Sequence, residues 1–187
     1  MLRGDALRNH WKVIRMSDDS LKSALRRTRR MALAAAAMLL SGAAAAEPAS
    51  GTINYQSKAG PIVINVAHVF LVKGPDAVSG KTIRQLVFAP ADIGAKLNAC
   101  ATLSCVSGNL SDGMTVDFDA GPRLNYWVVA NGQKVQYSGT AKPDESLKLT
   151  ADTADNLAGT LTLDDSKAGG AKVTVKFDAK TVKQFSK

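Results

Sequence analysis

Residues from which catalytic and metal sites are usually built are scarce in this chain. Its 187 residues include two cysteines and two histidines, and aromatic residues make up 5% of the sequence. No Gly-x-Ser-x-Gly elbow, His-Glu-x-x-His pair or phosphate-binding loop occurs. A zinc site at the cysteine pair would need further Cys or His ligands beside it. The sequence therefore predicts no catalytic residue, no metal and no cofactor.

An apolar run long enough to cross a membrane, about 20 residues, is also lacking. The segment 31–46 is mostly apolar, but it is short, rich in alanine and broken by a Ser-Gly pair. Four arginines within 26–30 precede it, and an Ala-x-Ala sequence ends at Ala46, directly before Glu47. A basic region, a short apolar region and small residues at a cut site are the three parts of a secretory signal.

We predict that residues 1–46 form an N-terminal extension with a cleavable signal peptide, cut between Ala46 and Glu47. Residues 47–187 are then the mature protein, periplasmic or secreted, of a bacterium. The paired arginines leave open whether the general or the twin-arginine route exports it. Because an ordinary signal does not need so long a preceding segment, Met16 is an alternative start of the chain.

Clustered positive charge is missing once the predicted signal is set aside. The whole chain has a formal net charge of +8, but residues 1–46 contain nine lysines and arginines against three aspartates, a net of +6. The remaining 15 basic and 13 acidic residues leave a net of +2. Binding to nucleic acid needs concentrated positive charge, so we predict no nucleic-acid partner. Removal of the apolar segment likewise leaves no stable membrane span.

Both cysteines, Cys100 and Cys105, follow the predicted signal. In an oxidising compartment such a pair is most simply a structural disulfide. It would close a short loop and contribute roughly 2–3 kcal/mol to stability. A redox site favours Cys-x-x-Cys, and a zinc site needs more ligands.

Alternation of apolar and polar residues with period two, punctuated by glycine, asparagine and aspartate, dominates the rest of the chain. The clearest hairpin joins 123–130 to 133–140 through Asn131-Gly132, which tolerates the positive φ angles of a type I′ turn. The run 62–73 is too long and too evenly apolar for a surface strand, so we expect it to be bulged or buried on both faces. Residues 91–99 favour a short helix.

This pattern predicts an all-β fold with eight to nine mostly antiparallel strands and one short helix near 91–99. Such a strand count forms a barrel or a two-sheet sandwich, and the sequence leaves both open. The 141 residues of 47–187 are enough for a single domain with its own core. We therefore expect a monomer.

Short strand and turn motifs extend over most of residues 51–182. They are Gly51-Thr52-Ile53, Ala67-His68-Val69-Phe70, a Leu-Val strand before a proline, Leu157-Ala158-Gly159-Thr160-Leu161 and Val175-Lys176-Phe177-Asp178-Ala179. In these motifs the chain resembles a group of small exported bacterial all-β proteins of unknown function. The resemblance implies a compact exported β module and assigns no catalytic residue.

Three side chains are candidates for ligand binding. His68 is the one histidine after the predicted signal; within an apolar strand it is either a core residue or a ligand-binding or catalytic group. Arg123, beside a predicted strand, would hold a carboxylate if it pointed inward, and Arg84 is predicted to point outward. Trp127 faces away from Tyr126 and is either an exposed aromatic anchor or a cover for the end of the core.

The leading hypothesis is a non-catalytic exported domain that binds a small apolar ligand or an envelope protein. A central cavity lined by apolar side chains would favour the ligand, whereas a filled core with Trp127 exposed would favour the protein partner. The side chains expected around such a cavity are Ile53, Val63, Leu86, Val128, Val175 and Phe177. The alternatives are a hydrolytic enzyme centred on His68 and a structural or surface protein.

Overall fold

The computed structural model describes residues 47–186, and the predicted signal peptide and its cleavage site lie outside or at the border of this range. Most of the described chain is in nine strands. The elements are β1 (Glu47–Ser57), β2 (Gly60–Pro75), β3 (Thr82–Ala89), α2 (Gly94–Ala99), α3 (Leu103–Gly108), β4 (Gly113–Phe118), β5 (Leu124–Ala130), β6 (Gln133–Ala141), α4 (Pro143–Ser146), β7 (Leu147–Asp152), β8 (Asn156–Asp164), the 3₁₀ helix η2 (Ser166–Ala168) and β9 (Lys172–Gln184).

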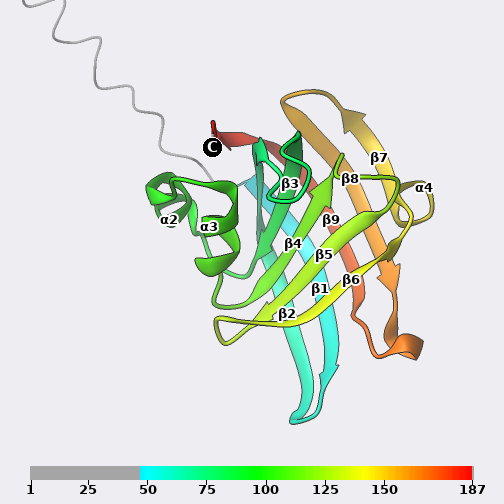
Figure 1. Cartoon of the computed structure of the whole chain (residues 1–187). Helices are drawn as coiled ribbons and strands as arrows, with labels where there is room; N and C mark the ends of the chain where they lie inside the picture. The colour runs from blue at the N-terminus through cyan, green and yellow to red at the C-terminus, as the bar shows by residue number, and fades with distance from the viewer. Residues whose placement is uncertain (1–46, 187) are drawn as a thin grey trace, which may run out of the picture. The chain divides into compact units, whose positions relative to one another are not determined.

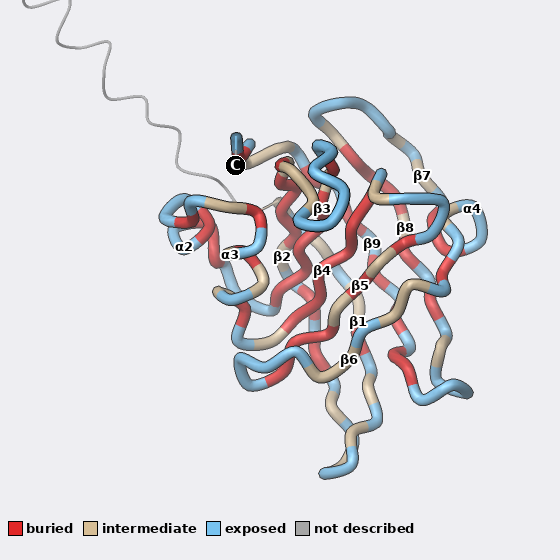
Figure 2. The backbone as a smooth tube through the Cα atoms, in the orientation of Figure 1, coloured by how far each residue is buried: buried red, intermediate tan, exposed pale blue. Residues whose placement is uncertain are grey.

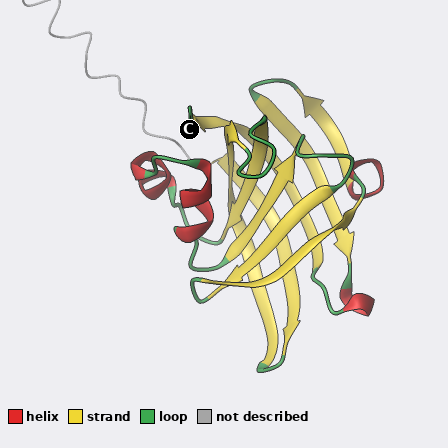
Figure 3. Ribbon diagram, viewed as in Figure 1, coloured by secondary structure: helices red, strands yellow, loops and turns green. Residues whose placement is uncertain are grey.

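All nine strands belong to one hydrogen-bonded sheet in the order β6-β5-β4-β3-β2-β1-β9-β8-β7. Neighbours in this order are antiparallel, and the sheet curls into a half-barrel (Figures 1 and 3). The all-β prediction is confirmed, and the nine strands form one curled sheet. Asn131 and Gly132, between β5 and β6, have φ of 53° and 73°, as the predicted type I′ turn requires.

β1 lies between β2 and β9, and it needs a glycine to do so. A Cβ atom on Gly51 would lie 2.1 Å from the carbonyl oxygen of Thr174 in β9, and the φ of Gly51 is +147°. The register with β2 shifts between Pro48 and Gly51. Beyond the first residue of β1, β2 and β9 pair with each other in parallel, with Leu71 opposite Thr181.

The concave face of the sheet holds the main core. Alternate residues of each strand point into it, such as Leu124, Tyr126 and Val128 of β5, and all three are buried. In β9, Val173, Val175 and Phe177 are buried, whereas Lys172, Thr174 and Lys176, which alternate with them, are exposed. Buried and exposed residues alternate along this strand (Figure 2). Burying a large apolar side chain in this way stabilises the fold by about 1.5–3 kcal/mol.

The second half of β2 is buried on both faces, which confirms one of the two expectations for residues 62–73. Val69 and Leu71 belong to the concave core, whereas Phe70 and Val72 belong to a second cluster on the outer face. α2 and α3 cover this outer cluster (Figure 1). A strand that is buried on both faces does not alternate between polar and apolar residues, and the sequence of this half of β2 shows no such alternation.

Two short helices carry the cysteine pair. α2 corresponds to the helix expected near 91–99, whereas α3 and α4 were not predicted. Cys100 and Cys105 are disulfide-bonded with Cα atoms 5.6 Å apart, so α2 and α3 are tied together. The Lys183 ammonium of β9 donates hydrogen bonds to three carbonyls at the end of α2, those of Leu97, Asn98 and Cys100.

Side chains bridge parts of the sheet that no ladder joins. Arg84 of β3 donates to both carboxylate oxygens of Asp119, at 2.7 and 3.0 Å, and also to Asp152 at the end of β7. The prediction that Arg84 points outward is wrong, because it shares the parity of the core residue Leu86 and its side chain is 17% exposed. Its charge is neutralised by two carboxylates that the sequence places far away.

No helix among residues 47–186 is long and apolar enough to cross a membrane.

Candidate functional site

The concave side of the sheet is packed with the side chains that were expected to surround a central cavity. Leu86, Val128 and Val175 have no exposed surface, and Phe177 is 3% exposed. Ile53 is equally buried, whereas Val63 is 58% exposed and lies outside this core. Apart from Val63, these residues form the interior of the fold, so the candidate ligand site lies elsewhere.

His68 and Arg123 are not among the residues that line the candidate pocket. His68 is half-buried in β2, opposite Pro48 and Ala89. Within residues 47–186 no side-chain hydrogen bond connects it to a carboxylate or a hydroxyl. Arg123 is exposed and donates to the carbonyl oxygen of Thr140 at 2.7 Å, so it joins β5 to β6.

Trp127 does line a pocket. It lies on the outer face of β5, opposite in direction to the buried Tyr126, as predicted. Its ring is 5.1 Å from that of Tyr137 on β6, and the Lys134 ammonium lies 5.2 Å from the ring centre. A cation at this distance is attracted by the ring face by roughly 0.5–1 kcal/mol at an exposed site.

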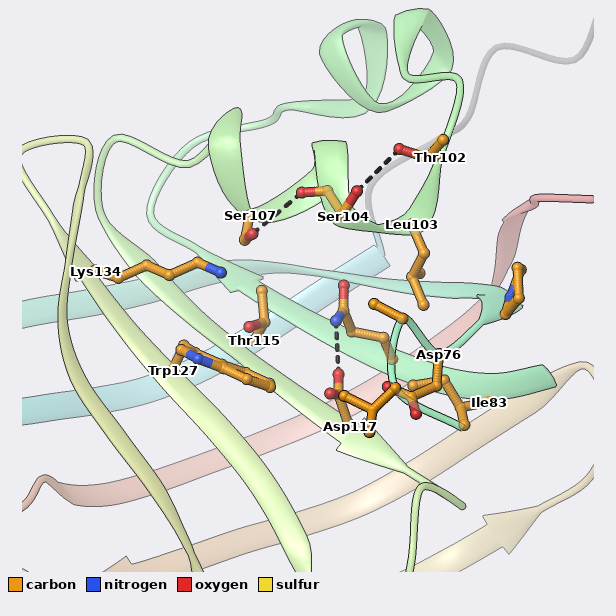
Figure 4. Close-up of a pocket in the computed structure, with 14 residues that line it drawn as sticks. Asp76, Ile83, Thr102, Leu103, Ser104, Ser107, Thr115, Asp117, Trp127 and Lys134 are labelled. Atoms are coloured by element: carbon orange, nitrogen blue, oxygen red, sulfur yellow. Dashed lines mark hydrogen bonds between the residues drawn. The ribbon is translucent and has the colours of Figure 1, made fainter. Parts of the chain in front are cut away.

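The pocket is a cavity of about 370 Å³ on the outer face of the sheet (Figure 4). Strands β3 to β6 form its floor, α3 lies over it, and the loop after β2 closes one side. This volume falls within the range of small-molecule sites. The lining residues are Pro75, Asp76, Ala77, Val78, Ile83, Gln85, Thr102, Leu103, Ser104, Ser107, Thr115, Asp117, Trp127 and Lys134.

Three buried polar side chains lie side by side on the floor. Gln85 is 7% exposed, Asp117 is 5% exposed and Thr115 is fully buried. Gln85 and Asp117 are opposite each other on β3 and β4, and the Gln85 amide donates from Nε2 to Asp117 Oδ1 at 2.6 Å. The Gln85 amide oxygen and the Thr115 hydroxyl have no hydrogen-bond partner among residues 47–186. Leaving such a group unpaired costs about 1–3 kcal/mol.

The environment of Asp117 changes its acidity. Burial raises the pKa of the Asp117 carboxyl to about 6, while the hydrogen bond from Gln85 acts in the opposite direction. The charge of Asp76 raises this pKa further and that of Lys134 lowers it. A carboxyl group with a raised pKa in a pocket is a common sign of a functional site.

Most of the pocket wall above this floor is apolar. Ile83, Leu103 and Trp127 contribute the larger apolar surfaces, and Val78 lies at the rim, 95% exposed. Ser104 and Ser107 of α3 add hydroxyl groups on the opposite side. The arrangement suits a ligand with an apolar body and a hydrogen-bonding head that meets the polar floor.

Sequence reasoning identified one pocket residue, Trp127, and missed the floor. Val116 and Phe118 of β4 point into the concave core, so Thr115 and Asp117 lie on the other face of this strand. The sequence analysis expected no element over that face, because α3 was not predicted. The sequence signal that could have revealed the floor is that both faces of β4 carry few charged residues, as in the buried half of β2.

Comparison with protein-family models, with curated proteins and with solved structures finds no match for this chain.

Proposed function

We propose that residues 47–187 form an exported, non-catalytic binding domain that holds a small molecule in the pocket on the outer face of β3 to β6. The observation that carries the proposal is the floor of Gln85, Thr115 and Asp117. Three buried polar side chains, two of them with an unpaired oxygen, destabilise a fold. Polar groups that destabilise a fold in this way are kept in natural proteins mainly at functional sites, and here they would serve a ligand.

The proposal modifies the sequence hypothesis of an apolar ligand. Apolar walls at Ile83, Leu103 and Trp127 support an apolar body, but the polar floor adds a head group. The export part rests on the predicted signal and on the Cys100–Cys105 disulfide, which is typical of an oxidising compartment.

A protein partner is the second candidate function. Tyr137 is 57% exposed and its ring packs against that of Trp127 at an interplanar angle of 40°. It lies on β6, which ends the sheet order. Exposed aromatic residues at a sheet edge favour binding of another chain. Hydrolysis at His68 has no comparable support, because His68 is outside the pocket lining.

The experiment uses the full chain, exported by a bacterial host and carrying Trp11→Phe. The chain has two tryptophans, so this change leaves Trp127 as the sole fluorescent reporter whether or not the leader is removed. Native mass spectrometry should reveal a bound small molecule, and its removal and return should change Trp127 emission.

The pocket-filling variant Ser107→Phe should weaken the binding at least about tenfold. The matched control, Val63→Phe on the exposed part of β2, should bind as the parent does. The proposal fails if no mass is retained and no compound of a fragment library changes Trp127 emission. It also fails if Ser107→Phe binds as tightly as the control.

A further inference from the structure

The charges around the pocket favour a cation. Asp76 and Asp117 line it together with one basic side chain, Lys134. Lys134 is exposed and lies over the Trp127 ring, and in the described part of the chain no salt bridge joins it to Asp117. The buried carboxylate of Asp117 therefore has one hydrogen bond, from the neutral amide of Gln85. Buried charges in proteins are normally paired with an opposite charge.

The hydrogen-bonding capacity of the floor points in the same direction. The Gln85 amide oxygen can only accept, and Nε2 uses one of its two N–H bonds for Asp117. An ionised carboxylate also only accepts, and the Thr115 hydroxyl can accept as well as donate. The free capacity of the floor is thus mainly for hydrogen-bond donors, and a group with several N–H bonds and a positive charge meets all three residues.

We infer that the pocket binds a protonated primary amine carried on an apolar body, with the ammonium group on Gln85, Thr115 and Asp117. This inference rests on the proposed function and names its ligand class. The apolar body would lie against Ile83 and Leu103. A primary ammonium has three N–H donors, and hydrogen bonds to a charged group are stronger than those between neutral groups.

Three probes of equal length separate this class from others: hexylamine, hexan-1-ol and hexanoate. Their binding to the exported full chain with Trp11→Phe is followed by Trp127 emission and by isothermal titration calorimetry. We expect hexylamine to bind at least about tenfold more tightly than hexan-1-ol, and hexanoate to bind most weakly.

Substitutions on the floor test the role of each oxygen. Asp117→Asn should reduce the preference for hexylamine over hexan-1-ol to less than about threefold. Thr115→Val keeps the shape and removes one acceptor, and it should weaken hexylamine binding. The matched control is Asp178→Asn on β9, an exposed carboxylate outside the pocket lining, which should change neither affinity.

Lys134 distinguishes cation binding from anion binding. Lys134→Met removes a positive charge from the lining, so it should strengthen hexylamine binding several-fold. If the natural ligand were an anion, Lys134 would hold it, and the same variant would abolish hexanoate binding. That outcome would overturn the inference.

The affinity for hexylamine should also fall as the pH is lowered through about 6, because Asp117 then takes up a proton, whereas the amine stays protonated. Asp76 and Lys134 are the other charged groups facing this site.

Tighter binding of hexan-1-ol or hexanoate than of hexylamine overturns the ligand class and leaves the proposed function standing. If none of the three probes changes Trp127 emission, the ligand class is wrong. The proposed function then also fails if the preparation retains no small molecule.

Discussion

At the scale of single residues, Asp117 makes the fold sensitive to pH. Burial raises the pKa of its carboxyl from 3.8 to about 6, so the folded chain binds a proton over a range in which the unfolded chain does not. The resulting stabilisation is fully present below about pH 4 and is lost as the pH rises through about 6. At about 1.36 kcal/mol per pH unit, the difference corresponds to roughly 3 kcal/mol at most.

Replacing Asp117 by Asn should remove this dependence. Asn stays neutral, so the variant should be about 1–3 kcal/mol more stable than the parent near pH 7 and nearly equal to it near pH 4. Urea unfolding at several pH values between these limits measures the effect. Asp178→Asn, on an exposed position of β9, should keep the slope of the parent. Parallel pH profiles for the parent and Asp117→Asn would contradict the assignment.

The same residues show where sequence reasoning stops. The parity of Trp127 and Tyr126 follows from alternation along one strand, and it was predicted. The contact between Gln85 and Asp117 depends on the register of β3 against β4, which alternation leaves undetermined. Arg84 was misassigned because its partners, Asp119 and Asp152, come from two other strand ends.

At the scale of elements, α3 and the disulfide determine the outer pocket. Strand periodicity was a strong signal, because each strand repeats it several times. α2 and α3 have six residues each, and such short helices rely on tertiary contacts more than on their own propensity. α3 therefore went unpredicted although its cysteine was assigned to the correct pair.

Removal of the disulfide should loosen α3 over the pocket. In Cys100→Ala/Cys105→Ala the unfolded chain regains the entropy of a short loop, so we expect a loss of about 2 kcal/mol. Leu103, Ser104 and Ser107 lie across the cavity from Trp127, so Trp127 emission should shift to the red. A reductant should produce the same shift in the parent and none in the double variant.

The control for this experiment is Lys183→Met, which frees the end of α2 and leaves the disulfide in place. It should destabilise the fold by about 1–3 kcal/mol through the lost charged hydrogen bonds without the change in Trp127 emission. An equal red shift in Lys183→Met would mean that α2, and not the tie to α3, determines the environment of Trp127.

At the scale of the whole molecule, the nine strands described for residues 47–186 pair with one another in a single sheet. β1 begins at Glu47, where it pairs with Val69 of β2, and β2 and β9 pair with each other just beyond this point. Each strand therefore finds its partners within residues 47–184.

A chain that starts at Glu47 should therefore be as stable as the domain within the longer chain, to within about 0.5 kcal/mol in urea unfolding. A chain that starts at Thr52 lacks the residues that pair with Phe177 and Lys176 of β9, and it should lose several kcal/mol or fail to fold. After export by a bacterial host, intact-mass measurement should find Glu47 as the first residue. A mass that includes earlier residues, or a large loss of stability in the chain starting at Glu47, would show that the leader belongs to the working protein.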